Sequence, residues 1–247
     1  MRSASSGIGQ GTAILFCKLG AEVAITGRNE ENLQKTAAEC EKQNGKKALA
    51  ITADLAKEDD TQKVMEKTIE HFKKLDILVN SAGIVETGTI ETTSLQQYDH
   101  VMNINVRSMY HLTMLAVPHL VKTKGSIVNV SSVNGMRSFP GVLAYCMSKS
   151  AVDQFTRCIA LELASKQVRV NSVNPGVIIT EIHKRGGMDE EAYQKFLERT
   201  KFTHALGRPG DVIEVANTIA FLASESSSFI TGAQVPIDGG RHAMCPR

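Results

Sequence analysis

Short apolar runs alternate with longer, more polar segments along this sequence, and that alternation limits the possible folds more than any other feature. A parallel strand needs a crossover connection, usually a helix, so strands and helices at this spacing indicate βαβ units. The sequence therefore predicts an α/β fold, a doubly wound parallel sheet with helices on both faces in three layers. The expected strands are 21–26, 48–53, 77–79, 127–130 and 168–173, and the expected helices include 10–19, 30–44, 95–121 and 211–223.

The bulk composition favours one soluble domain that binds a small molecule. The chain has 247 residues, 42% of them hydrophobic, and no Gly/Pro/Ser-rich linker or repeat divides it, so we expect a single domain over 1–247. Lys and Arg are scattered among Asp and Glu at a net charge of +2, which argues against a nucleic-acid or membrane partner. Five Cys without a Cys-x-x-Cys pair predict reduced thiols in the cytoplasm, and seven His without ligand spacing predict no metal site.

The stretch 125–151 carries a hydroxyl, a phenol and an amine in a usable arrangement. Tyr145 and Lys149 lie four residues apart and therefore share one face of a helix. Ser132 follows the strand 127–130, so its hydroxyl is expected at the carboxyl edge of the sheet, where open α/β folds bind ligands. The trio suits proton transfer to or from an oxygen, with Tyr145 as general acid or base and the Lys149 ammonium lowering the pKa of the phenol. Tyr-x-x-x-Lys alone is also common in helices where the Lys is simply solvated.

The spacing of Ser132, Tyr145 and Lys149, followed by Ser150-Ala151, resembles the active-site block of the short-chain dehydrogenase/reductase family. The resemblance implies that Tyr145 is the acid/base, that Ser132 polarises the carbonyl or alkoxide, and that Lys149 holds the nicotinamide ribose. Asn105 stands at the family position of an Asn that anchors a water leading to the Lys. The implied fold is the seven-stranded version of the Rossmann sheet.

Other stretches resemble the family's cofactor-binding motifs. The opening residues resemble its Thr-Gly-x-x-x-Gly-x-Gly phosphate loop, and a helix N-terminus after the loop offers free N–H groups to a pyrophosphate. Asp54 is expected beside the adenine, although it could equally cap the helix that follows it. The residues that the resemblance assigns to the cofactor are Ser5, Ser6, Gly7, Ile8, Gly9, Arg28, Asp54, Leu55, Asn80, Ala82, Gly83, Tyr145, Lys149, Pro175, Gly176, Ile178 and Thr180.

The end of the strand 21–26 bears on the choice between NAD and NADP. An acidic residue here would hold a ribose 2′-hydroxyl and repel a 2′-phosphate, but the position is Gly27. Arg28 beside it supplies a planar charged fork that suits a phosphate. A solvated Arg at a helix start is the alternative. We therefore expect NADP(H), with NAD(H) less favoured.

The start of the chain departs from the family pattern. Arg2-Ser3 stands where Thr-Gly is expected, and no apolar strand precedes the phosphate loop. Because that strand is central in the family's sheet, we expect the 247-residue chain to be a truncated or mis-started form, poorly folded and weak in cofactor binding. A catalytically impaired cofactor-binding or interaction protein is the corresponding alternative to an active enzyme.

The predicted function is NADP(H)-dependent interconversion of a carbonyl and a secondary alcohol. The segment at about 181–206 is polar and broken by glycines, so it is either a mobile lid over the substrate or a surface helix with no active role. A sugar-nucleotide epimerase or dehydratase also uses Tyr-x-x-x-Lys, but such chains usually continue into a further domain. The expected partners are a small carbonyl or alcohol substrate and further copies of the chain in a homotetramer or homodimer. Fold and motif do not choose the substrate.

Overall fold

The protein folds into a three-layer α/β/α arrangement, as the alternating pattern predicts. The computed structural model describes residues 4–244 and contains six strands within that range, all in parallel pairing. They fall into a four-stranded and a two-stranded group. The first comprises β3 (Ile77–Asn80), β4 (Ser126–Val130), β5 (Arg169–Pro175) and β6 (Gln234–Ile237) in that order, and the second pairs β1 (Ala24–Gly27) with β2 (Leu49–Thr52).

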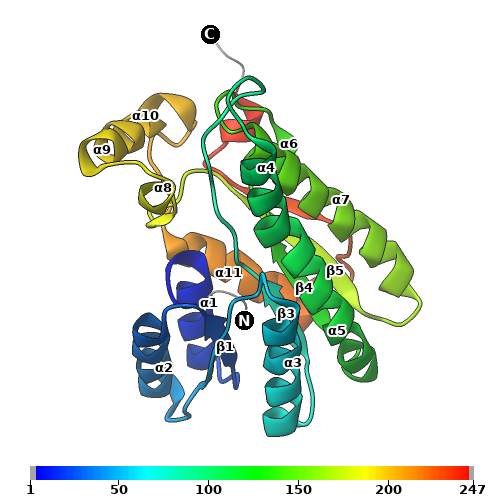
Figure 1. The fold of residues 1–247 in the computed structure, drawn as a ribbon. Coiled ribbons are helices and arrows are strands. Elements are labelled where there is room, and N and C mark those ends of the chain that lie inside the picture. The colour runs from blue at the N-terminus through cyan, green and yellow to red at the C-terminus, as the bar shows by residue number, and fades with distance from the viewer. Residues whose placement is uncertain (1–3, 245–247) are drawn as a thin grey trace.

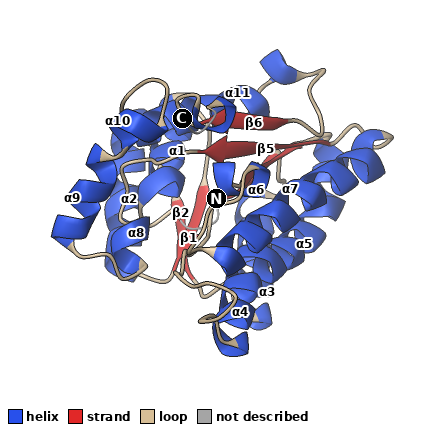
Figure 2. Ribbon diagram, turned by 90° about the horizontal axis from the view of Figure 1, so that it is seen from above, coloured by secondary structure: helices blue, strands red, loops and turns tan. Residues whose placement is uncertain are grey.

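Helices cover both faces of the strands, as seen from above in Figure 2. One face carries α1 (Gly7–Lys18), α2 (Glu30–Asn44) and α11 (Val212–Ala223), and the other carries α3 (Glu58–Phe72), α4 (Leu95–Met102), α5 (Ser108–Thr123) and α7 (Leu143–Ala164). The strands face both layers because successive side chains point to opposite sides. Ile127 packs with α5 and α7, whereas its neighbour Val128 packs with α1 and α11.

Local sequence signals explain where the helices begin and end. The Asn29 side chain accepts a hydrogen bond from the backbone of Asn32 and starts α2, and Gly45 ends it with a φ of 73°. Asp211 and Glu214 form a reciprocal capping box at the start of α11. The expected helix 95–121 is interrupted by a π-helical turn, η1 (Asn103–Arg107), which separates α4 from α5.

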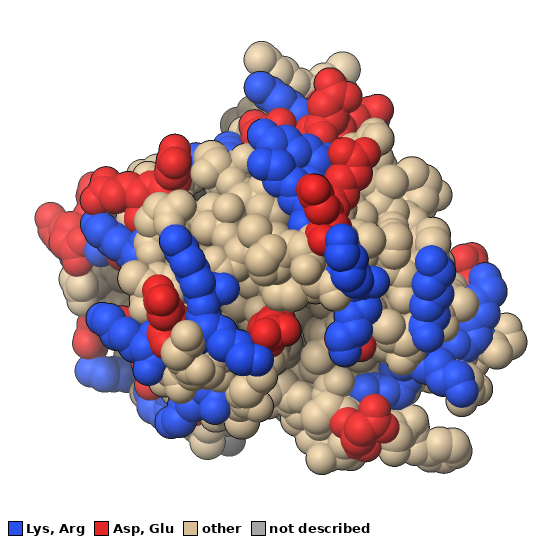
Figure 3. Space-filling view, turned by 90° about the horizontal axis from the view of Figure 1, so that it is seen from below, with Lys and Arg blue, Asp and Glu red and all other residues tan. Residues whose placement is uncertain are grey.

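The expected lid segment folds into three short helices near the start of α1, coloured yellow and gold in Figure 1: α8 (Ile182–Arg185), α9 (Glu190–Glu198) and α10 (Thr200–Thr203). The remaining short elements are α6 (Val133–Met136), η2 (Glu225–Ser227) and η3 (Arg241–Ala243). Within the described residues no helix is long and apolar enough to span a bilayer. Lys and Arg are interspersed with Asp and Glu on the face drawn in Figure 3.

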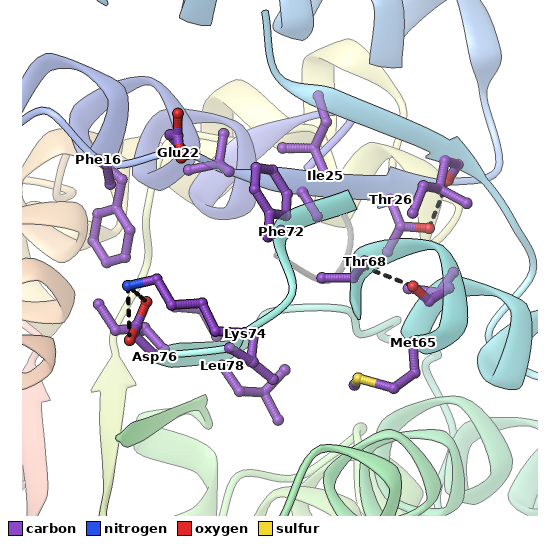
Figure 4. A pocket seen from close by; sticks show the side chains of 18 of the residues that line it. Phe16, Glu22, Ile25, Thr26, Met65, Thr68, Phe72, Lys74, Asp76 and Leu78 are labelled. Carbon is purple, nitrogen blue, oxygen red and sulfur yellow. Dashed lines mark hydrogen bonds and ion pairs between the residues drawn. The ribbon is translucent and has the colours of Figure 1, made fainter. Parts of the chain in front are cut away.

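The sheet is interrupted between β1 and β3. A cavity of about 370 Å³ separates the two strands and is lined by Ile25 from β1, Phe72 from α3 and Leu78 from β3 (Figure 4). The described chain starts beside this gap, because the buried Ala4 donates its N–H to the carbonyl of Thr26 at 2.9 Å. The described residues 4–244 include no strand ahead of α1. Arg2 and Ser3, on which the expectation of a faulty start depends, lie outside the described residues.

An added strand should fill this cavity and stabilise the protein. We expect a chain with about six apolar β-forming residues and Thr-Gly ahead of Ala4 to melt at least about 5 °C higher, since each apolar side chain buried contributes about 1.5–3 kcal/mol. Circular dichroism melts and NADPH titration would measure the change.

A Gly/Ser extension of equal length is the matched control, because it adds chain without apolar side chains. If the apolar extension melts no higher and binds NADPH no more tightly than this control, the two groups of strands do not need a strand between them.

Candidate active site

A continuous groove runs past the carboxyl ends of the strands. One part, with a volume of about 560 Å³, contains Ser132, Tyr145 and Lys149 in its wall. The other, of about 590 Å³, contains Arg28 and Asp54. Ser6, Gly83, Val85, Ile182, Arg185 and Gly186 border both parts and therefore join them.

The Ser132, Tyr145 and Lys149 side chains reach this groove from two elements. Ser132 follows β4 and caps the short helix α6, where its Oγ accepts the N–H of Asn134 at 3.1 Å. Tyr145 and Lys149 lie one turn apart on α7, with Lys149 Nζ 5.6 Å from the centre of the Tyr145 ring. The structure therefore brings together the three residues that the sequence pattern selected.

The pKa of Tyr145 differs from the sequence-based expectation. Burial raises the pKa of the phenol to about 12, and a hydrogen bond with Ser132 only partly offsets this. The expected lowering of this pKa is thus wrong for the protein without cofactor, because desolvation outweighs the hydrogen bond with Ser132. The Tyr145 residue keeps some exposed surface toward the groove. A raised pKa leaves the phenol protonated at neutral pH and ready to donate its proton.

Lys149 is held at the end of β4. Its Nζ donates to the carbonyl of Val130 at 3.0 Å, and the residue is only 4% exposed. Gly83 lies beside it, and a Cβ there would be 3.4 Å from both Lys149 Nζ and Asn105 Oδ1. The missing side chain of Gly83 thus leaves this spot accessible to a ligand.

Asn105 connects the loop after β3 to α7 through hydrogen bonds. It lies in the π-helical turn η1, and such turns are frequent at functional sites. Its Nδ2 donates to the carbonyl of Ile84 at 3.0 Å and to Ser148 Oγ at 2.9 Å, while its Oδ1 accepts the N–H of Ile84 at 2.9 Å. The side chain therefore fixes the backbone next to Gly83 relative to α7.

Three buried residues that the sequence pattern did not single out, Ser131, Asp153 and Asn174, form hydrogen bonds that hold Ser132 and Lys149 in place. Asn174 Nδ2 donates to the carbonyl of Ser132 and to the carboxylate of Asp153, each at 3.0 Å. Ser131 Oγ donates to the carbonyl of Lys149 at 3.2 Å. Burial raises the pKa of Asp153, and hydrogen bonds from Ser131 and Asn174 oppose that effect. Asp153 follows Lys149 by four residues, so helical spacing was the available signal.

The phosphate-loop residues have the geometry that a pyrophosphate site needs. Helix α1 begins at Gly7, whose φ of 56° is unfavourable for other residues, and free N–H groups face the groove at this end. A Cβ on Gly7 would lie 3.3 Å from Thr180 Cγ2, so the loop and the segment after β5 approach closely. Ser6 Oγ accepts a hydrogen bond from Arg185 at 2.8 Å. The residues lining the groove here are Ser6, Gly7, Ile8, Gly9, Gly176, Ile178 and Thr180.

The far end of the groove is bordered by Ser5, Arg28, Asp54, Leu55, Ala82 and Gly83. Arg28 is exposed. Asp54 does not cap α3, whose N-cap residue is Lys57; its Oδ1 instead accepts the N–H of Ala56 at 3.1 Å in the turn before that helix. Gly27 is buried against the phosphate loop, and a Cβ on it would lie 2.9 Å from Ser5 Oγ.

Asn80 and Pro175 are expected cofactor residues that do not line either part of the groove. Asn80 Nδ2 donates to Asn129 Oδ1 at 2.9 Å and to Thr113 Oγ1 at 3.1 Å, so it connects β3 with β4 and α5. Pro175 is buried at the end of β5.

Conversely, His183, Arg199 and Arg241 line the groove without belonging to any motif. Among the described residues no group of three His, Cys, Asp or Glu side chains could hold a metal ion.

Comparison with known proteins matches this architecture. A family profile described as "Enoyl-(Acyl carrier protein) reductase" covers residues 3–242. A 3-oxoacyl-[acyl-carrier-protein] reductase of Thermotoga maritima is 38% identical over 96% of this chain and 94% of its own length. The chain belongs to the short-chain dehydrogenase/reductase family. This family of oxidoreductases uses nicotinamide cofactors.

Other members show how widely this short-chain dehydrogenase/reductase fold is shared. A meso-2,3-butanediol dehydrogenase of Serratia marcescens is 36% identical over 97% of this chain and 92% of its own. A crystal structure of a family member of unknown function from Caenorhabditis elegans, determined with cofactor, superposes with a TM-score of 0.91 at 37% identity. It covers 99% of this chain and 94% of that one.

Removing the Asn105 side chain should destabilise the site. We expect Asn105→Ala to lower the free energy of unfolding by about 1–3 kcal/mol, because both backbone groups of Ile84 lose their partner. Urea denaturation monitored by circular dichroism would measure this change without any cofactor.

Asn103→Ala in the same π-helical turn is the matched control, since that residue makes none of these contacts. Equal stability of the two variants would show that Asn105 does not hold the loop.

Proposed function

We propose that the protein catalyses the NADP(H)-dependent interconversion of a carbonyl and a secondary alcohol. The observation that supports this most is the convergence of Ser132, Tyr145 and Lys149 on one groove that continues to a glycine-rich helix N-terminus. Its wall accommodates a nicotinamide cofactor at Gly83 and Gly7, where side chains are absent. When bound, the nicotinamide would supply or accept the hydride at the substrate carbon.

The chain's own residues manage the proton. In reduction, the carbonyl oxygen lies between the Ser132 hydroxyl and the Tyr145 phenol, which both donate hydrogen bonds to it. Tyr145 transfers its proton to that oxygen as the hydride reaches the carbon, so a neutral alcohol forms. The resulting phenolate is stabilised by the ammonium of Lys149 and regains a proton from solvent by way of Lys149 and the Asn105 region.

At the far end of the groove, Arg28 is the residue that we expect to select NADP(H). Arg28 would bind the 2′-phosphate of NADP(H), because the groove at this end contains a guanidinium and no acid at Gly27. The segment at about 181–206 would cover the bound molecules, with Arg185 contacting Ser6 of the phosphate loop. A homodimer or homotetramer is supported by the exposed side chains Tyr110 and Met114 of α5 and Leu161 of α7. The location that we propose is the cytoplasm.

The raised pKa of Tyr145 predicts different pH profiles for the two directions. Reduction should be nearly independent of pH between about 6 and 9, because the phenol stays protonated, whereas alcohol oxidation needs the phenolate and should speed up about tenfold per pH unit. Initial rates of NADPH oxidation with a carbonyl panel, and of NADP⁺ reduction with the matching alcohols, measure both.

Tyr145→Phe should lower turnover about 10²–10⁴-fold while NADPH still binds. Tyr110→Phe on α5 is the matched control and should keep full activity. A Tyr145→Phe protein that retains more than about a tenth of wild-type turnover would rule out Tyr145 as the acid.

Cofactor preference depends on Arg28. We expect Arg28→Leu to shift the ratio of NADPH to NADH affinity toward NADH by at least about tenfold, since a charge-assisted hydrogen bond contributes about 1.5–3 kcal/mol. Fluorescence titration with both cofactors measures the ratio. Arg28 is changed alone because a side chain at Gly27 would press on Ser5.

Lys35→Leu on the exposed side of α2 removes the same charge away from the groove and serves as control. An unchanged ratio in Arg28→Leu would mean that residues other than Arg28 recognise the 2′-phosphate.

A further inference from the structure

Besides Lys149 and Arg185, two further basic side chains line the part of the groove that contains Tyr145, and no carboxylate of the described residues lines it. Arg199 follows α9, and Arg241 begins η3. Both line the part of the groove that contains Tyr145, and no Asp or Glu is among the described residues that border this part. Within residues 4–244 neither guanidinium forms an ion pair with a carboxylate.

The two guanidinium groups are close enough to affect each other. Burial lowers the pKa of Arg241, Asp238 opposes this, and Arg199 lowers it further. Arg241 nevertheless stays charged, because an Arg side chain does not lose its proton in proteins. The carboxylate of Asp238 already accepts hydrogen bonds from the backbone and ring of His242 and from the N–H of Gly240. Two like charges at one wall of a groove attract an anion.

The position of Arg241 assigns this pair to the substrate rather than to the cofactor. Its guanidinium lies 4.4 Å from the centre of the Phe139 ring, and Phe139 belongs to the connection between Ser132 and Tyr145. The cofactor part of the groove has other cations, namely Arg28 and the Arg185 side chain at Ser6. His183 also faces the substrate end, where burial and then Arg241 lower the pKa of its ring, so it is neutral at pH 7.

We propose that the substrate is an acidic carbonyl compound, whose oxyanion is bound by Arg199 and Arg241 while its carbonyl lies at Ser132 and Tyr145. This inference rests on the proposed function and adds the substrate class to it. The planar fork of Arg binds carboxylate and phosphate oxygens in pairs, and the Phe139 ring holds the Arg241 fork in place. The oxyanion is a carboxylate or a phosphate, and both satisfy the same donors.

The test compares acids with their neutral counterparts. Pyruvate, acetoacetate and levulinate, which differ in the separation of carbonyl and carboxylate, are each paired with the methyl ester, and dihydroxyacetone phosphate is paired with dihydroxyacetone. We expect kcat/KM with NADPH to be at least about tenfold higher for at least one acid than for its neutral counterpart. The member with the largest ratio shows which oxyanion and which separation fit.

Variants locate the source of the preference. Arg199→Gln combined with Arg241→Gln should lower the ratio of kcat/KM for the acid to kcat/KM for its neutral counterpart by at least about tenfold, through a higher KM for the acid. The kcat/KM for the neutral counterpart should change less than about twofold. Arg241→Lys should show only part of the preference for the acid, because Lys supplies the charge without the planar fork of Arg. Lys201→Gln is the control, since Lys201 pairs with Glu198 and does not line the groove.

Calorimetric binding of the same compounds separates this inference from the proposed function. If no carbonyl is reduced in a Tyr145-dependent way, the proposed function fails, but tighter binding of an acid that depends on both arginines still supports the anion site. If every acid is bound and reduced no better than its neutral partner, or if the preference survives in the double variant, the inference is wrong.

Discussion

The pairing of β4 with β5 is the interaction on which the site depends. Ile127 lies opposite Val170 in a parallel register, and both are fully buried, so a shift by one residue would turn apolar side chains to the wrong layer. This register brings the ends of the two strands together. Asn174, near the end of β5, can then hold the carbonyl of Ser132 after β4 and the carboxylate of Asp153 on α7. Strand pairing thus fixes α7 and the Ser132 hydroxyl relative to each other.

The groove separates its charges along its length. Arg28 lies along the part that fits a dinucleotide, Arg185 borders both parts, and Arg199 and Arg241 lie in the part that contains Tyr145. Between them the lining is small or neutral at Gly7 and Gly83. A buried phenol with a raised pKa and two guanidinium groups at one end suit an anionic molecule that accepts a proton.

A cavity interrupts the strands between β1 and β3, whereas Ser132, Tyr145 and Lys149 all line one groove. Parallel strands are normally buried on both faces and paired on both edges, yet here a cavity lies between two such edges. Ser132, Tyr145 and Lys149 belong to the four-stranded group and the helices packed on it, whereas Arg28 follows β1 of the two-stranded group. The two parts of the groove therefore rest on different groups of strands, which meet mainly through α1 and its packing against α2 and α11.

The sequence alone determined the layers, the alternation of strands and helices along the chain and the residues Ser132, Tyr145 and Lys149, because apolar periodicity and an i, i+4 spacing are local properties. It also determined the glycine-rich loop at the start of α1. Only the tertiary structure decided that burial raises the pKa of Tyr145, that Asn80 connects strands instead of lining the groove, and that Arg199 and Arg241 line the same part of the groove. Each of these features involves residues that are far apart in the chain. Their burial and their hydrogen bonds depend on how the helices and strands pack together, and a local sequence pattern does not encode that packing.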